Sequence, residues 1–189
     1  NFGSLTIAGN GATVDGGTID RVFDMGGDLT ISTLTISNLT VRNGNPGGNN
    51  GGGIRVGNGD TLNLTNVVVA DSVSGLSGGG ISSAGTVNLT DVTISGNLAS
   101  NVGGGFNNST ASSSVLTANR STISGNVAMG SGGAGLYNES SATASLTNVT
   151  ISGNELNTYV DGKRERLTRY PIEAAGPMVI VIKGTWTLE

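Results

Sequence analysis

The feature that most limits the possible folds is an internal repeat. A seven-residue phrase ending in Ile-Ser-Gly-Asn recurs at residues 91–97, 120–126 and 148–154, with weaker copies at 38–44 and 66–72. Its central apolar residue advances by 28, 25, 29 and 28 positions, through Val41, Val69, Ile94, Ile123 and Ile151. A glycine phrase follows each of the first four copies, at residues 51–54, 78–81, 103–106 and 133–136. A repeat of this length indicates a solenoid, in which each unit buries its apolar face against its neighbours.

The pattern inside one repeat has a period of two. In the third copy Val87 and Leu89 alternate with polar residues, and so do Val92 and Ile94, which indicates half-buried strands. Between the two pairs the spacing slips from two to three, so a sharp bend must turn the later side chains inward again. No segment shows the apolar spacing of three and four that a helix needs. We therefore predict an all-β fold, a right-handed parallel β-helix of about six rungs.

Rungs stacked about 4.8 Å apart place equivalent residues in columns. Three inward columns are predicted to form the core: Val41, Val69, Ile94, Ile123, Ile151; Ile36, Leu64, Leu89, Ala118, Leu146; and Ile54, Ile81, Phe106, Leu136. A bend column is predicted to act as a structural ladder that passes side-chain hydrogen bonds between rungs: Asn38, Asn66, Asp91, Arg120 and Asn148. Asp91 and Arg120 interrupt the asparagines on adjacent rungs, so we expect them to form an ion pair.

Composition narrows the function classes. The chain of 189 residues contains 33 glycines and 4% aromatic residues, but no histidine or cysteine. This excludes disulfides, Cys/His zinc sites and any mechanism with a histidine base or cysteine nucleophile. A net charge of −4 argues against a nucleic-acid partner held by phosphate contacts. No stretch approaches the roughly 20 apolar residues of a membrane span, and no cofactor is expected.

The two phrases resemble the β-helix repeats of bacterial cell-surface proteins, in particular the polymorphic outer membrane protein repeat. In that repeat an aromatic-x-x-Asn element alternates with Gly-Gly plus an aliphatic residue, and here Ile94-Ser95-Gly96-Asn97 fills the first role with Ile in place of Phe. The opening residues 9–24 are similar to the first rung of many secreted repeat proteins. The resemblance covers roughly residues 4–156. It implies an extracellular or bacterial cell-surface location and a structural or adhesive role, with glycan or protein partners and without catalysis.

Polysaccharide cleavage is the alternative function. The early acids Asp15, Asp20, Asp24 and Asp28 could supply the paired carboxylates of glycoside hydrolysis. These acids belong to the first rung, however, and the later acids form no column. If the protein is an enzyme, Asp15, Asp20 and Asp24 are the predicted catalytic residues.

Two further sequence features suggest ligands. The segment Val56–Leu62 is similar to a single calcium-binding nonapeptide, with Asp60 as its weak candidate ligand, although a plain turn is the favoured interpretation.

Hydroxyl residues recur on the outward positions of three rungs: Thr93, Ser95, Thr122, Ser124, Thr150 and Ser152. Such an array could match ice or another ordered lattice, but Thr and Ser also suit any solvent-facing strand.

The last segment of the chain differs from the repeats. We assign residues 1–156 to the β-helix and 157–189 to a cap or an oligomerisation segment, with the last two residues interpreted as a cloning remnant. Thr158–Lys163 predicts a hairpin that turns at Asp161-Gly162. The apolar run Met178–Ile182 predicts a strand that could pair with its copy in another chain.

Overall fold

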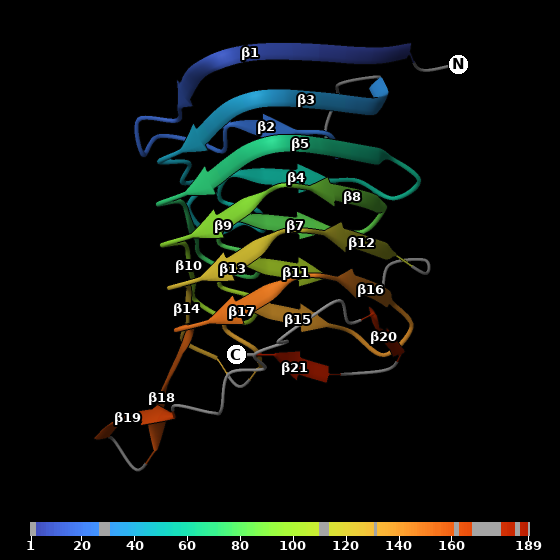
Figure 1. The fold of residues 1–189 in the computed structure, drawn as a ribbon. Coiled ribbons are helices and arrows are strands. Elements are labelled where there is room, and N and C mark those ends of the chain that lie inside the picture. Colours follow the sequence, from blue (N-terminus) through green and yellow to red (C-terminus); the bar gives the residue numbers. More distant parts are fainter. Residues whose placement is uncertain are drawn as a thin grey trace.

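The strands stack as a parallel β-solenoid of about five turns (Figure 1). The computed structural model describes residues 3–26, 31–109, 114–130, 132–160, 163–167, 179–183 and 186–188, with side chains described as far as residue 157. In Figure 1 the front strands run from right to left and the rear strands from left to right as the chain descends, which is a right-handed winding. The all-β prediction is confirmed.

A ten-stranded sheet forms the widest wall of the solenoid. Its strands are β1 (Gly3–Asp15), β3 (Ile31–Arg42), β5 (Thr61–Ala70), β8 (Thr86–Thr90), β9 (Thr93–Ser95), β12 (Val115–Asn119), β13 (Thr122–Ser124), β16 (Thr143–Thr147), β17 (Thr150–Ser152) and β20 (Val179–Lys183). The first three strands run through the predicted bend, whereas in later turns the bend divides each strand into two. The sheet therefore has two arms, one before the bend and one after it.

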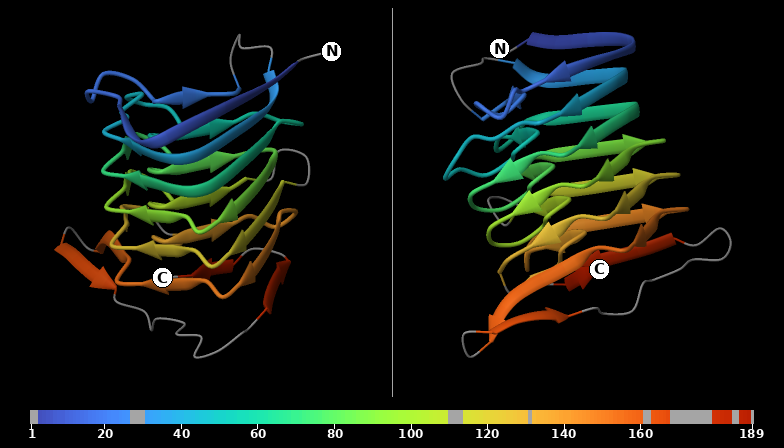
Figure 2. Two further views of the ribbon diagram at one scale, coloured as in Figure 1. Left: turned by 45° about the horizontal axis from the view of Figure 1, so that its top comes forward. Right: turned by 90° about the vertical axis from the view of Figure 1, so that its left-hand side faces the viewer.

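Two smaller sheets complete each turn (Figure 2). The five-stranded sheet contains β6 (Val73–Ser74), β10 (Leu98–Ala99), β14 (Val127–Ala128), β18 (Glu155–Val160) and β19 (Lys163–Leu167). The six-stranded sheet contains β2 (Phe23–Asp24), β4 (Ile54–Val56), β7 (Ile81–Ser83), β11 (Phe106–Asn108), β15 (Leu136–Asn138) and β21 (Trp186–Leu188). The last residue of each glycine phrase begins a strand of the six-stranded sheet.

The predicted inward columns form the core. Residues spaced 25 to 30 positions apart face one another across adjacent strands, as in Leu64 opposite Leu89 and Phe106 opposite Ile81. Every member of the three predicted columns is at most 3% exposed. Aliphatic side chains stacked in this way exclude water without aromatic residues, which accounts for the low aromatic content.

The two ends of the solenoid differ. At the C-terminal end β19, β20 and β21 pair antiparallel with β18, β16 and β15, so a reversed strand ends each sheet. The two strands of the predicted hairpin pair, with Val160 opposite Lys163, while its turn residues Asp161 and Gly162 lie outside the described residues. Leu188 lies in β21 opposite Leu136. At the N-terminal end β1 pairs with β3 alone among the described strands, and Leu5 and Val14 are 44% and 37% exposed.

The terminal strand predicted at Met178–Ile182 lies at the C-terminal end of the solenoid. Val179–Lys183 forms β20, while Met178 lies outside the described residues. β20 pairs with β16 of the same chain, which is the position expected of a cap. Within the part of the chain that the structure describes, no helix is long and apolar enough to cross a membrane.

Candidate functional site

The six predicted hydroxyl residues stack on the outward face of the ten-stranded sheet, after the bend. They form one column of threonines and one of serines: Thr93, Thr122, Thr150 and Ser95, Ser124, Ser152. The strand register extends the threonine column through Val68 to Thr40 and Thr13. The serine column continues instead into Ala70, Arg42 and Asp15, so its early members are not hydroxyls.

A larger hydroxyl array precedes the bend, and our sequence analysis missed it. Three outward columns cross the six parallel strands of this arm, from β1 to β16, and we call them the hydroxyl face: Ser4, Thr33, Thr61, Thr86, Val115, Thr143; Thr6, Thr35, Asn63, Asn88, Thr117, Ser145; and Ala8, Ser37, Thr65, Thr90, Asn119, Thr147. All but five of these residues are Ser or Thr, and none is charged or aromatic. The signal was present as Thr at alternate positions before each bend.

The hydroxyl face is regular and open to solvent. All of its residues in β5, β8, β12 and β16 are partly or fully exposed, and no described strand crosses it in Figure 1. Asn88 Nδ2 donates to Asn63 Oδ1 at 2.9 Å, and Asn63 Nδ2 donates to Thr35 Oγ1 at 3.3 Å. Threonine has a stiff χ1 torsion, so its hydroxyls hold nearly fixed positions. The face presents hydroxyls at about 4.8 Å intervals along the solenoid.

The predicted bend column is exposed and structural in character. All five members adopt a left-handed backbone, with φ between 47° and 55°. Asn66 Nδ2 donates to Asn38 Oδ1 at 2.7 Å. Arg120 donates to both carboxylate oxygens of Asp91, at 2.8 and 2.7 Å, which is the ion pair that we expected. These hydrogen bonds, together with the positive charge of Arg120, hold the pKa of Asp91 below its usual range.

A second asparagine ladder is buried inside the solenoid, at a position that our sequence analysis had not assigned to a ladder. It consists of Asn97, Asn126 and Asn154, the last residues of the three strong phrases, and each is at most 5% exposed. Asn126 Nδ2 donates to Asn154 Oδ1 at 2.9 Å and to the Ile94 carbonyl at 3.0 Å. Its Oδ1 accepts from both the backbone N–H and Nδ2 of Asn97, at 3.0 Å each. The ladder thus satisfies backbone groups that the turn would otherwise leave unpaired.

The recurring glycines are explained by this ladder. Gly125, which precedes Asn126, has a φ of 63°, a left-handed conformation that costs glycine no steric penalty. Gly105, from the glycine phrase, packs on the ladder itself: a Cβ there would lie 2.7 Å from the Gly135 carbonyl oxygen and 2.8 Å from Asn126 Nδ2. Glycine is therefore favoured at Gly125 by the backbone conformation and at Gly105 by the close approach of neighbouring atoms.

The early acids are held by arginines and do not form a described carboxylate pair. Asp15 Oδ2 accepts from Arg42 Nε at 2.9 Å, and Asp24 Oδ1 accepts from Arg55 Nε at the same distance. Arg21 also pairs with Asp24. Asp20 accepts from the backbone N–H of Arg21, and Asp28 lies outside the described residues. Asp15 ends β1 in the ten-stranded sheet, whereas Asp24 ends β2 in the six-stranded sheet.

The protonation of these acids does not favour general acid catalysis. The pKa of Asp15 is lowered by hydrogen bonds from the backbone N–H of Gly17 and from the side chains of Asn43 and Arg42. Burial alone would raise the pKa of Asp24, but the Gly26 N–H and the two arginines outweigh it, and the pKa is lowered. A glycosidase acid instead needs a raised pKa so that it carries a proton near neutrality. At Asp60 burial raises the pKa against the effect of the Gly57 N–H. Among the described residues no group of three acids that could hold a metal is present there or elsewhere.

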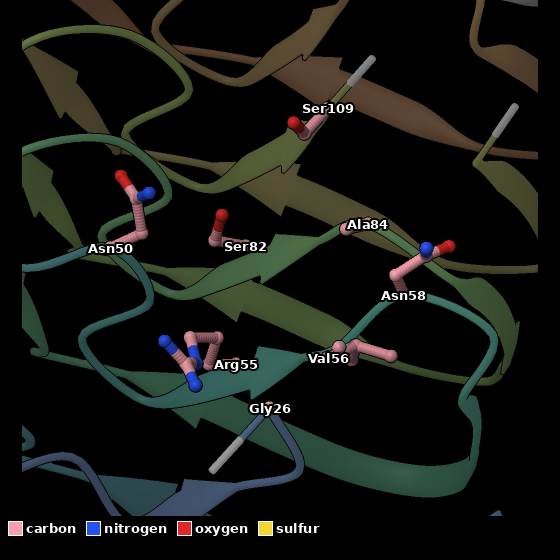
Figure 3. A pocket seen from close by; sticks show the side chains of 9 residues that line it. Gly26, Asn50, Arg55, Val56, Asn58, Ser82, Ala84 and Ser109 are labelled. Atoms are coloured by element: carbon pink, nitrogen blue, oxygen red, sulfur yellow. The ribbon is translucent and has the colours of Figure 1, made fainter. Parts of the chain in front are cut away.

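A polar groove opens on the outward face of the six-stranded sheet (Figure 3). Its cavity measures about 300 Å³. The residues that line it come from four successive turns and include Gly26, Asn50, Arg55, Ser82 and Ser109. We call this the Arg55 groove. From the sequence, Val56, Gly57 and Asn58 were named only as part of the nonapeptide-like segment, and the groove was not predicted, because only the stacking of the turns brings its residues together.

Comparison with protein-family models, with curated proteins and with solved structures finds no match to this chain. The likeness to bacterial surface-protein repeats therefore depends on the sequence motifs alone.

Proposed function

We propose that this protein is a structural and adhesive segment of an exported bacterial surface protein, and that it binds a glycan or protein surface without catalysis. The hydroxyl face carries this proposal. It is broad, uncharged and uncovered by described elements, and it repeats the same donors and acceptors along the solenoid. A surface of this kind suits a partner with its own regular array of polar groups, because many weak hydrogen bonds then form together.

The acids support a non-catalytic role over polysaccharide cleavage. Asp15 and Asp24 each engage an arginine and have lowered pKa values. Neither therefore has the raised pKa of a general acid. Cleavage of a polysaccharide that is abolished by Asp24→Asn would replace the adhesive proposal with the enzymatic one.

An ordered lattice, such as the surface of ice, is the second candidate partner. One observation favours it: five of the six residues in the column from Thr13 to Thr150 are threonines, with Val68 as the exception. Each threonine offers a methyl group and a hydroxyl in a restrained rotamer. Such a surface can hold water molecules in a repeating pattern.

Bulky substitutions test both candidates. Thr117→Tyr interrupts the hydroxyl face, Thr122→Tyr interrupts the threonine column after the bend, and Leu76→Tyr changes an exposed loop residue as the control. The measurements are retention on insoluble neutral polysaccharides, with release of soluble products, and adsorption to growing ice. We expect Thr117→Tyr to reduce retention at least tenfold, while the melting temperature and the Leu76→Tyr control stay unchanged.

The outcomes separate the candidates. Ice adsorption that Thr122→Tyr abolishes would favour the lattice function. Failure of the parent protein to bind any surface, or retention that Thr117→Tyr does not alter, would contradict the adhesive role of the hydroxyl face.

A further inference from the structure

We propose that the Arg55 groove is a second binding site and that it takes the carboxylate of an acidic sugar unit. The groove lies on a different sheet from the hydroxyl face. The inference therefore goes beyond the proposed function, and either site can fail its test while the other passes.

Arg55 is held in place before any ligand arrives. It lies in β4 between Asp24 and Ser82 in the outward column of the six-stranded sheet. Its Nε donates to Asp24 Oδ1 at 2.9 Å, and its guanidinium lies against Gly26, where a Cβ would be 2.6 Å from Nη2. The guanidinium is thus clamped between a carboxylate and bare backbone.

The two terminal nitrogens of the Arg55 guanidinium remain available to a ligand. Its side chain is 34% exposed and lines the cavity. Its two terminal nitrogens make no hydrogen bond with another described residue. A guanidinium presents its donors in a planar fork that matches a carboxylate in a bidentate arrangement. Fixing the fork in advance lowers the entropy lost when that bond forms.

Neighbouring side chains supply further donors. Ser82 Oγ accepts a long hydrogen bond of 3.5 Å from Asn107 Nδ2, which leaves the Ser82 hydroxyl hydrogen free to donate. Asn50 Oδ1 accepts from the Ser77 N–H, so its Nδ2 group remains available as a donor. These groups can bind the hydroxyls and ring oxygen that accompany a sugar carboxylate.

The charge in the groove selects an anion. Arg55 is the one charged side chain that lines it. Arg21 shares Asp24 with Arg55, so two arginines face one carboxylate at this end of the groove. Asp60 lies against the Gly57 wall and is not a lining residue. Arg55 therefore makes the lining itself positively charged, in a protein of net charge −4.

The test compares one oligosaccharide in two charge states. The probes are trigalacturonic acid, which carries free carboxylates, and its methyl ester, in which these groups are uncharged. Binding is measured by isothermal titration calorimetry. The variant is Arg55→Gln. The matched control is Arg42→Gln, because Arg42 also donates through Nε to a first-turn aspartate at 2.9 Å but lies outside the groove.

We expect the parent protein and Arg42→Gln to bind the acid at least tenfold more tightly than the ester. Arg55→Gln should weaken binding of the acid by roughly ten- to a hundredfold, the range for a lost charged hydrogen bond, and leave the ester unchanged. Ser82→Ala should weaken binding of both probes by a smaller factor. The proposal is overturned if the parent does not bind the acid, if it binds acid and ester equally, or if Arg55→Gln binds the acid like the parent. Unchanged far-ultraviolet circular dichroism confirms that the variants are folded.

Discussion

The two bends in each turn meet the same backbone requirement in different environments. Both turn the chain through a left-handed residue, at Arg120 in the exposed bend and at Gly125 in the buried bend of the same turn. At the exposed bend, residue types vary and neighbours interact through single surface contacts. At the buried bend, each of the last three copies has Gly followed by Asn, and every amide makes several hydrogen bonds.

The comparison teaches that burial, and not backbone shape, makes a turn intolerant of change. Water can replace a lost side-chain bond at the exposed bend, so Asn, Asp and Arg are all accepted there. No water reaches the buried ladder, and an unpaired backbone group there costs the full desolvation penalty. In the last three copies the repeat is therefore strict at the inward asparagine.

The strongest test of this contrast removes one amide from each bend. Asn126→Ala removes the acceptor of the Asn97 N–H and a donor to the Ile94 carbonyl, and we expect it to lower the free energy of unfolding by about 2–6 kcal/mol. Asn66→Gly removes the exposed bond to Asn38 while it keeps the left-handed φ, and should cost below about 1 kcal/mol. Urea denaturation measures both values. Equal losses would show that the buried ladder has no special role.

A pair of glycine substitutions sharpens the comparison. At Gly105 an added methyl group meets the Gly135 carbonyl and Asn126 Nδ2 within 3 Å, so Gly105→Ala should cost about 1–3 kcal/mol through overpacking of the ladder. At Gly125 nothing lies within 4 Å of an added Cβ, and Gly125→Ala should cost about 1 kcal/mol through its φ of 63° alone. Combination with Asn126→Ala distinguishes the two causes. The cost of Gly105→Ala should shrink in that background, and that of Gly125→Ala should not.

The smallest effect is expected at the exposed ion pair. Because Arg120 lowers the folded-state pKa of Asp91, its contribution to stability is present above the unfolded pKa near 3.9 and is lost as the pH falls through the folded value. Asp91→Asn should slightly lower the urea midpoint at pH 7, and the two midpoints should approach each other as the pH falls below about 3.9. A difference that does not shrink with falling pH, or that resists 1 M salt, would mean that the ion pair is not its source.

The sequence predicted the stacking of the turns well because stacking depends on spacing. Apolar residues 25 to 30 positions apart, such as Leu64 and Leu89, can share a column only in a solenoid, and the predicted columns are buried. The slip before Asp91 also located a real bend, where Asp91 adopts a left-handed φ of 55°. The columns of Thr and Ser after the bend were predicted from the same residue spacing.

What the sequence did not decide is which polar residue of a repeat faces inward. Asn97 and Asn148 both occupy turns and are the same residue type, yet the first is fully buried and the second is exposed. The direction of a side chain after a left-handed residue depends on how the next strand docks, which local propensity does not encode. The first asparagine ladder was therefore predicted at the exposed bend, and the buried one was missed.

By itself, then, the sequence determined the period, the strand pattern and the aliphatic core of this protein, because these follow from residue spacing and from the alternation of side chains along a strand. Only the tertiary structure decided where polar groups meet. Arg55, Ser82 and Ser109 come together because successive turns lie one strand spacing apart. Arg42 and Arg55 hold different aspartates for the same reason. Contacts between turns join residues far apart in the chain, and their partners are settled only when the whole stack has formed.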